Sequence, residues 1–363
     1  MKIIDIIAGA RPNFIKIAPI IKSIEKRKAS PNFNLDYRLV HTGQHYDYEM
    51  SQVFFDELNI PPPKYNLNIS GGSHAQMTAE MLRALEEVII QEEPNFVLVY
   101  GDTNSTLSGA LAAAKIHTPV VHMEAGLRSF NKKMPEEINR ILTDHLSSLL
   151  LCPSETAIEN LNNEGINSGV VDVGDIMVDA ANKAQAIVQN NNSYLPKVEN
   201  FDFLNAFDLL TLHRAENTDD DSRLRAIFEA LSFADRPILF PIHPRTKKII
   251  AEHGIELPEL VKLCEPLSYL AMASILNRVS NVITDSGGLQ KEAYWVGKPC
   301  ITLRDETEWV ETLEGGANRL VGADKEKIID ALKSRDKISF SEHLYGDGNA
   351  ASSSVKAMMD FFQ

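Results

Sequence analysis

The stretch that decides the fold is Pro119-Val-Val-His-Met-Glu-Ala-Gly-Leu-Arg-Ser-Phe-Asn-Lys-Lys-Met-Pro-Glu-Glu-Ile-Asn-Arg140. Its apolar start predicts a strand that ends at Met123, and Pro135 suits the first turn of a helix. A strand, a loop and a helix form the repeating unit of open α/β sheets, which place ligands beyond the carboxyl ends of their strands. Glu124 occupies that position, so the loop that follows it is a candidate site.

The same alternation of short apolar runs with segments of helical length extends along most of the chain. The predicted strands are 3–8, 37–41, 96–100, 119–123, 149–152, 170–173, 208–212, 237–241, 261–264, 281–284 and 299–303. This order is typical of parallel, doubly wound sheets. A polar tract at 189–196 separates two such series. We therefore predict two Rossmann-like domains, 1–175 and 176–350, and a last helix, 351–363, that is placed to cross back onto the first domain.

Composition restricts the class of protein. The chain has 363 residues, more than one core usually accommodates, and 44% of them are hydrophobic. We expect a soluble cytoplasmic protein without membrane partners, because no apolar run approaches about 18 residues. A net charge of -14 disfavours nucleic acid as a partner. The three cysteines, Cys152, Cys264 and Cys300, lie far apart, which predicts buried thiols rather than a disulfide or metal site.

Three carboxylates of the predicted first domain are candidates for proton transfer. Asp102 and Glu124 follow predicted strands, and Glu136 lies in the first turn of the helix that Pro135 begins. Carboxylates that converge on one pocket perturb each other's ionisation, as acid and base catalysts require. Each also has a plainer interpretation: Asp102 can cap the helix near Asn104, and Glu136 can form a surface ion pair with Arg140.

Anion-binding candidates follow other strands. Arg11 and Lys16 lie in the turn after the first strand, which lacks the glycines of a dinucleotide fingerprint, and Arg140 is the third cation of this domain. In the second domain, Ser286, Gly287 and Gly288 open a helix, whose free N–H groups suit a diphosphate. Glu292 lies one turn further and can accept hydrogen bonds from ribose hydroxyls. Each of these residues can equally be an ordinary surface residue.

Two histidines follow strands of the second domain. His213 and His243 can stabilise a leaving phosphate or carry a proton, although a single histidine in such a position is more often structural. Arg304 and Thr307 follow a later strand and can line the nucleotide side of the site. Trp309, nearby, can equally be a packed anchor. No histidine or cysteine spacing predicts a metal site.

The ordered motifs resemble those of the non-hydrolysing UDP-N-acetylglucosamine 2-epimerases along nearly the whole chain. They are Gly9 to Lys16, Gly101-Asp-Thr103, Glu124 to Arg128, Pro135 to Arg140, His213, Thr284 to Glu292 and Tyr345-Gly-Asp-Gly348. The resemblance implies the B-type glycosyltransferase fold, with two Rossmann-like domains across a cleft. It also implies a UDP-sugar substrate, a homodimer and no metal or nicotinamide cofactor.

The implied reaction inverts C2 of the sugar by eliminating UDP to a glycal and adding it back. On this resemblance Asp102, Glu124 and Glu136 transfer protons, and the UDP-binding residues are Arg11, Lys16, Arg140, His213, Ser286, Gly287 and Glu292. Trp309-Val310 stands where common bacterial members have Arg-Pro. Together with 41–47 and 129–131, this is similar to the branch that acts on UDP-2,3-diacetamido-2,3-dideoxyglucuronate, and Arg128, Lys132 and Lys133 are candidates for binding its carboxylate. A hydrolysing epimerase and a retaining glycosyltransferase are the alternatives.

Overall fold

The computed structural model describes residues 1–363 except 32, 44–54, 56, 190, 342–343 and 363, and it also leaves out the side chains of residues 11 and 12. The segment 44–47, which the branch comparison used, and the side chain of Arg11 therefore lie outside the described part. The described residues form two compact units. The first is Met1–Asn182 with Tyr345–Gln363, and the second is Lys183–Leu344.

The strands of the first unit are β1 (Lys2–Ala8), β2 (Leu35–His41), β3 (Tyr65–Asn66), β4 (Phe96–Tyr100), β5 (Val120–Met123), β6 (Leu149–Cys152) and β7 (Val170–Asp172). The strands of the second are β8 (Asp208–Thr211), β9 (Ile238–Pro241), β10 (Val261–Cys264), β11 (Val282–Thr284), β12 (Cys300–Thr302) and β13 (Asn318–Leu320). All the predicted strands are present. The sequence analysis missed the two edge strands β3 and β13.

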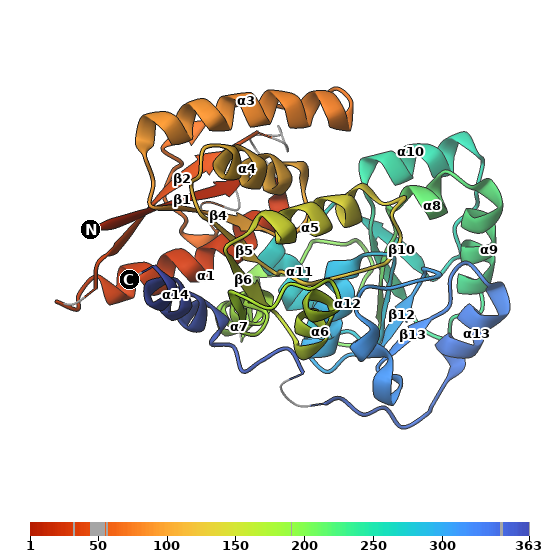
Figure 1. Cartoon of the computed structure of the whole chain (residues 1–363). Coiled ribbons are helices and arrows are strands. Elements are labelled where there is room, and N and C mark those ends of the chain that lie inside the picture. The colour runs from red at the N-terminus through yellow and green to blue at the C-terminus, as the bar shows by residue number, and fades with distance from the viewer. Residues whose placement is uncertain (32, 44–54, 56, 190, 342–343, 363) are drawn as a thin grey trace. The chain divides into compact units, whose positions relative to one another are not determined.

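The helices alternate with these strands along the chain (Figure 1). They are α1 (Arg11–Arg27), α3 (His74–Glu92), α4 (Asn104–Lys115), α5 (Pro135–Leu146), α6 (Glu155–Asn163), α7 (Ile176–Val188), α8 (Ala215–Thr218), α9 (Asp221–Leu231), α10 (Pro244–Glu252), α11 (Tyr269–Leu276), α12 (Gly287–Trp295), α13 (Lys325–Lys333) and α14 (Ala350–Phe361), with short 3-10 helices at Asn192–Tyr194 and Val310–Gly316. Within this described part of the chain, no helix combines the length and apolarity needed to cross a membrane.

Both sheets are parallel and doubly wound, as predicted. The order is β3-β2-β1-β4-β5-β6-β7 in the first sheet and β10-β9-β8-β11-β12-β13 in the second. Each order reverses direction once, between β1 and β4 and between β8 and β11. Such a reversal is where open α/β sheets bind ligands, just beyond the carboxyl ends of the two strands. The topology therefore marks one candidate place in each unit.

The apolar strands are buried on both faces. In the second sheet, Leu209 packs in one core with α11 and α12, whereas its neighbour Leu210 packs in the other with α9 and α13. Ile238 and Leu239 divide between the two cores in the same way. Successive side chains of a strand point to opposite faces, so a continuous apolar run fits a sheet that helices cover on both sides.

The last helix belongs to the first unit. Figure 1 shows α14 beside α1, and the Arg27 guanidinium donates to the backbone and hydroxyl oxygens of Ser352, at 3.1 and 2.7 Å. Phe362, just after α14, stacks on Phe96 with ring centroids 4.1 Å apart.

The cysteines are free thiols. Cys152 and Cys300 are buried, and burial raises the pKa of the Cys300 thiol to about 12. Cys264 is only partly buried, which corrects the prediction for this residue, because it ends β10 at the edge of its sheet. The described residues contain no group of three or more His, Cys, Asp and Glu side chains arranged to hold a metal ion.

Candidate active site

Four of the predicted motifs follow the strands at the two topological reversals. In the first unit, Gly9 follows β1 and Asp102 follows β4. In the second unit, His213 follows β8 and Ser286 follows β11. The sheet order thus brings together, within each unit, loops that are far apart in the sequence.

Glu124 is held in a specific conformation beside Lys16. Its backbone φ is +66°, in the left-handed region that residues with a side chain rarely adopt. The side chain is 5% exposed and forms an ion pair with the Lys16 ammonium. Burial alone would lower the pKa of Lys16, but the adjacent Glu124 carboxylate outweighs burial and raises it. Lys16 is therefore a fixed cation beside the Glu124 side chain, at a place where stored backbone strain often accompanies function.

Asp102 lies next to this pair. A Cβ placed on Gly101 would lie 3.2 Å from Glu124 Oε2 and 3.4 Å from Lys16 Nζ, so the backbone before Asp102 borders the pair closely. The Asp102 carboxylate accepts a hydrogen bond from Arg140 Nη2 at 2.6 Å and is 31% exposed. Asp102 is not the cap of α4, because Thr103 accepts from the backbone N–H of Thr106. The plainer interpretation of Asp102 was wrong. We call Lys16, Asp102, Glu124 and Arg140 the carboxylate cluster.

The structure pairs Arg140 with Glu137, the residue that follows Glu136. Glu136 is exposed in the first turn of α5, and Glu137 is buried. Glu137 accepts from the backbone N–H groups of Ser129 and Phe130, both at 2.9 Å, and from Arg140 Nη1 at 2.9 Å. Glu137 thus fixes the loop before α5 and orients Arg140, which the sequence analysis had paired with Glu136.

An ionic network centred on the buried Asp144 supports the loop that follows Glu124. Asp144 accepts from His122 Nδ1 at 2.6 Å and from Arg128 Nη1 at 2.7 Å, and Arg128 also donates to Glu164 from Nε at 2.6 Å. Burial raises the pKa of Asp144, but His122 and Arg128 outweigh it and lower the pKa overall. Arg128 is engaged on several sides and buried, so the prediction that it binds a substrate carboxylate was wrong. Lys132 and Lys133 are exposed.

In the second unit, the helix predicted to open at Ser286 is α12, and Ser286 is its N-cap. Its hydroxyl accepts from the Leu289 backbone N–H at 3.4 Å, and its own N–H donates to Thr284 Oγ1 at 2.9 Å. A Cβ on Gly287 would lie 2.4 Å from Glu308 Oε1, whereas one on Gly288 would meet nothing nearer than 4.0 Å. The helix N-terminus at Gly287 and Gly288 supplies N–H donors and a positive dipole end, which together suit a phosphate.

Asp285 joins this helix start to the loop of His213. The buried carboxylate accepts from the backbone N–H groups of His213 at 3.0 Å and Arg214 at 2.9 Å, and it lies 3.2 Å from His213 Nδ1. Burial raises the pKa of Asp285, but these donors outweigh it and lower the pKa. The exposed ring of His213 is therefore oriented by a fixed carboxylate. His243 instead caps α10, since its Nδ1 accepts from the Arg245 N–H at 3.2 Å.

The remaining predicted residues of the second unit are buried or half-buried, and two of them form side-chain hydrogen bonds. Arg304 is 1% exposed and donates to Glu308 at 2.9 Å, and Thr307 donates to Gln290 at 2.7 Å. Glu292, half-buried on α12, contributes with burial to the raised pKa of Tyr269.

Trp309 is a buried anchor. The exposed fraction of its side chain is 6%, and the Lys291 ammonium lies 3.7 Å from its ring centroid. A cation over the face of an indole is a stabilising arrangement. The tryptophan that departs from the common family pattern therefore fixes the segment that carries Glu308.

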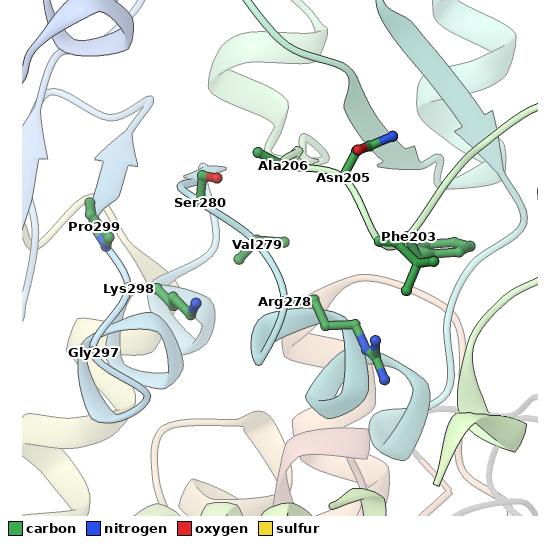
Figure 2. Close-up of a pocket in the computed structure, with 10 residues that line it drawn as sticks. Phe203, Asn205, Ala206, Arg278, Val279, Ser280, Gly297, Lys298 and Pro299 are labelled. Carbon is green, nitrogen blue, oxygen red and sulfur yellow. The ribbon is translucent and has the colours of Figure 1, made fainter. Parts of the chain in front are cut away.

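A cavity of about 540 Å³ in the second unit lies at the amino ends of the strands (Figure 2). Its lining includes Asn205, Arg278, Ser280, Lys298 and Pro299, which precede β8, β11 and β12. In a parallel sheet these residues lie at the amino ends of the strands, whereas His213 and Ser286 lie at the carboxyl ends. The cavity is therefore separate from the candidate site.

Four contributors had no sequence signal that we recognised: His122, Glu137, Asp144 and Asp285. A buried histidine or acid between apolar residues is a usable signal in retrospect, because burying an unpaired charge is costly and implies a partner. The identity of that partner depends on the fold.

The site and fold define an α/β protein with a carboxylate cluster in one unit and, in the other, a helix start whose N–H groups suit a phosphate. The chain belongs to the UDP-N-acetylglucosamine 2-epimerase family, whose model matches residues 27–359.

Similar proteins cover nearly the whole chain. The UDP-2,3-diacetamido-2,3-dideoxy-D-glucuronate 2-epimerase of Pseudomonas aeruginosa is 49% identical over 97% of this chain and 98% of its own. A UDP-N-acetylglucosamine 2-epimerase homolog of Methanococcus maripaludis is 47% identical over 99% of both chains. The structure of the Methanocaldococcus jannaschii UDP-GlcNAc 2-epimerase in complex with UDP-GlcNAc and UDP has a TM-score of 0.87, 43% identity, and covers 99% of this chain and 100% of that one.

Proposed function

We propose that the protein is a non-hydrolysing 2-epimerase of a UDP-2-acetamido sugar. The observation that carries the proposal is the carboxylate cluster, in which Glu124 and Asp102 follow adjacent strands and each is paired with a cation. Proton removal and return at one carbon needs two such groups near each other. Family membership supports the same reaction.

The chemistry explains why a leaving group is needed. The C2–H bond of an acetamido sugar has no neighbouring carbonyl to acidify it, so direct deprotonation is slow. In the proposed reaction a base takes the C2 proton while the C1–O bond to UDP breaks, and the electron pair forms the C1–C2 double bond of a glycal. The UDP oxygen then adds back to C1, and an acid protonates C2 on the opposite face. Glu124 and Asp102 exchange these roles between the two directions, with the exposed Glu136 as a third candidate.

The second unit is proposed to bind the UDP. Ser286, Gly287 and Gly288 would donate to the diphosphate from the start of α12, and His213, oriented by Asp285, would stabilise the departing group. Glu292 would accept from ribose hydroxyls. Lys16, Arg11, Arg140, Arg304, Thr307 and His243 remain proposed contributors to binding.

For the sugar itself we propose UDP-2,3-diacetamido-2,3-dideoxyglucuronate. The Pseudomonas relative named for this substrate is 49% identical, and the pair Trp309-Val310 resembles that branch. A uronate carboxylate needs a cation or N–H donors. Since Arg128 is engaged by Asp144 and Glu164, the exposed Lys132 and Lys133 are the better candidates. UDP-N-acetylglucosamine is the second candidate, which the Methanococcus relative supports.

We predict a higher kcat/KM for the diacetamido-glucuronate than for UDP-N-acetylglucosamine when both are assayed side by side. The expected product is the C2 epimer, still linked to UDP. Replacing Lys132 and Lys133 by Met should lower kcat/KM for the uronate and leave the value for UDP-N-acetylglucosamine nearly unchanged. Equal or better efficiency with UDP-N-acetylglucosamine would contradict the assignment of the sugar.

Two alternative activities have distinct products. A hydrolysing epimerase releases UDP and free N-acetylmannosamine, because water captures the intermediate. A retaining glycosyltransferase needs an acceptor and does not need the carboxylate cluster, which is the observation that favours an epimerase. The homodimer and the cytoplasmic location stay predictions.

A further inference from the structure

His122 is fully buried between the two loops that carry the proposed acid and base. It lies on β5, and its side chain is 0% exposed. Nδ1 lies 2.6 Å from Asp144 Oδ1, and Nε2 lies 2.8 Å from the carbonyl oxygen of Gly101. Both ring nitrogens therefore lie within hydrogen-bond distance of an oxygen atom.

Both partners of the ring are acceptors. The Gly101 carbonyl has no proton to give, so Nε2 must donate to it. The other Asp144 oxygen already accepts from Arg128 Nη1 at 2.7 Å and the Gly126 N–H at 3.1 Å, and the adjacent Arg128 guanidinium favours the ionised form of Asp144. Nδ1 must then donate as well.

The two hydrogen bonds join loops with different functions. Gly101 has φ +64° and directly precedes Asp102. Asp144, the other partner, holds the N–H of Gly126, two residues after Glu124. His122 therefore links the backbone next to Asp102 directly, and the backbone near Glu124 through Asp144.

We propose that His122 is a positioning residue, a buried imidazolium that fixes the Gly101–Asp102 loop against the Glu124–Gly126 loop. It transfers no proton to the substrate itself. The inference rests on the proposed function, because the two loops matter only if Asp102 and Glu124 move the C2 proton. Small displacements of such groups lower the rate of the chemical step more than they lower binding.

Two near-isosteric variants separate the two hydrogen bonds. His122→Asn keeps a donor near the Nδ1 position, facing Asp144, and loses the one that faces Gly101. His122→Gln keeps a donor near the Nε2 position, facing Gly101. We expect His122→Asn to lower kcat about tenfold or more while KM and the UDP dissociation constant stay within about twofold, and His122→Gln to recover part of kcat.

A kcat of His122→Asn within about twofold of the parent would overturn the proposal, as would an equal loss of UDP affinity. A His122→Gln variant no better than His122→Asn would also contradict it. These assays use the UDP-sugar on which the parent enzyme is most active.

A second measurement needs neither a variant nor activity. In the intact protein labelled with 15N-histidine, the 15N NMR spectrum under the conditions of the activity assay should show both ring nitrogens of His122 protonated. A ring with one unprotonated nitrogen would overturn the imidazolium assignment. If the spectrum is as expected but the protein epimerises no UDP-sugar, the failure lies with the proposed function and not with the state of His122.

Discussion

Replacing Glu124 with glutamine is expected to lower turnover at least about a hundredfold, the usual contribution of a proton-transferring side chain. The amide keeps the size and shape of the carboxylate but can neither accept the C2 proton nor form the ion pair with Lys16. UDP affinity should change little, because the substitution leaves the diphosphate donors proposed at the start of α12 unchanged. Steady-state kinetics and calorimetric titration with UDP separate the two quantities.

Asp102→Asn provides a parallel test, and Glu155→Gln provides the matched control. Glu155 is an exposed carboxylate in the first turn of α6, so its amide variant should keep parental turnover. If Glu124→Gln retained turnover near that of the control, Glu124 would not be an acid or base of the reaction.

The largest expected loss of stability follows from Asp144→Asn. Asp144 is 1% exposed and binds both His122 and Arg128. The amide cannot neutralise these cations, and breaking a buried ion pair on one side costs about 3–5 kcal/mol of unfolding free energy. Urea unfolding measured by circular dichroism should show the loss.

Glu164→Gln is the control for this variant. Glu164 also binds Arg128 but is 27% exposed, so water can replace part of the interaction, and the expected loss is about 1 kcal/mol or less. Equal effects of the two substitutions would show that the network is not organised around Asp144.

The parts of the fold that local patterns encode could be predicted. Strands such as 96–100 and 149–152 are short apolar runs because both faces of each sheet are covered, and the start of α12 follows from Ser286 and two glycines. The edge strands β3 and β13 could not be predicted. They contain few residues, and pairing with a neighbour defines them rather than any hydrophobic period.

The residue types of the site and their positions in the sequence could be predicted. The interaction partners of these residues could be predicted less well. Lys16 and Glu124 are 108 residues apart, so nothing local indicates that they form an ion pair. Glu136 and Glu137 are both within one helical turn of Arg140, and spacing alone cannot distinguish them. The loop at Ser129 and Phe130 distinguishes the two glutamates, because its backbone N–H groups donate hydrogen bonds to Glu137.

The exchange of hydrogen for deuterium at C2 tests the central claim most directly. The protein is incubated with UDP-2,3-diacetamido-2,3-dideoxyglucuronate, and separately with UDP-N-acetylglucosamine, in deuterated water, and the sugar is followed by proton NMR. We predict that deuterium enters C2 of at least one substrate while both epimers remain linked to UDP at equilibrium. Accumulation of free sugar and UDP would identify a hydrolysing enzyme, and absence of exchange with both substrates would contradict elimination altogether.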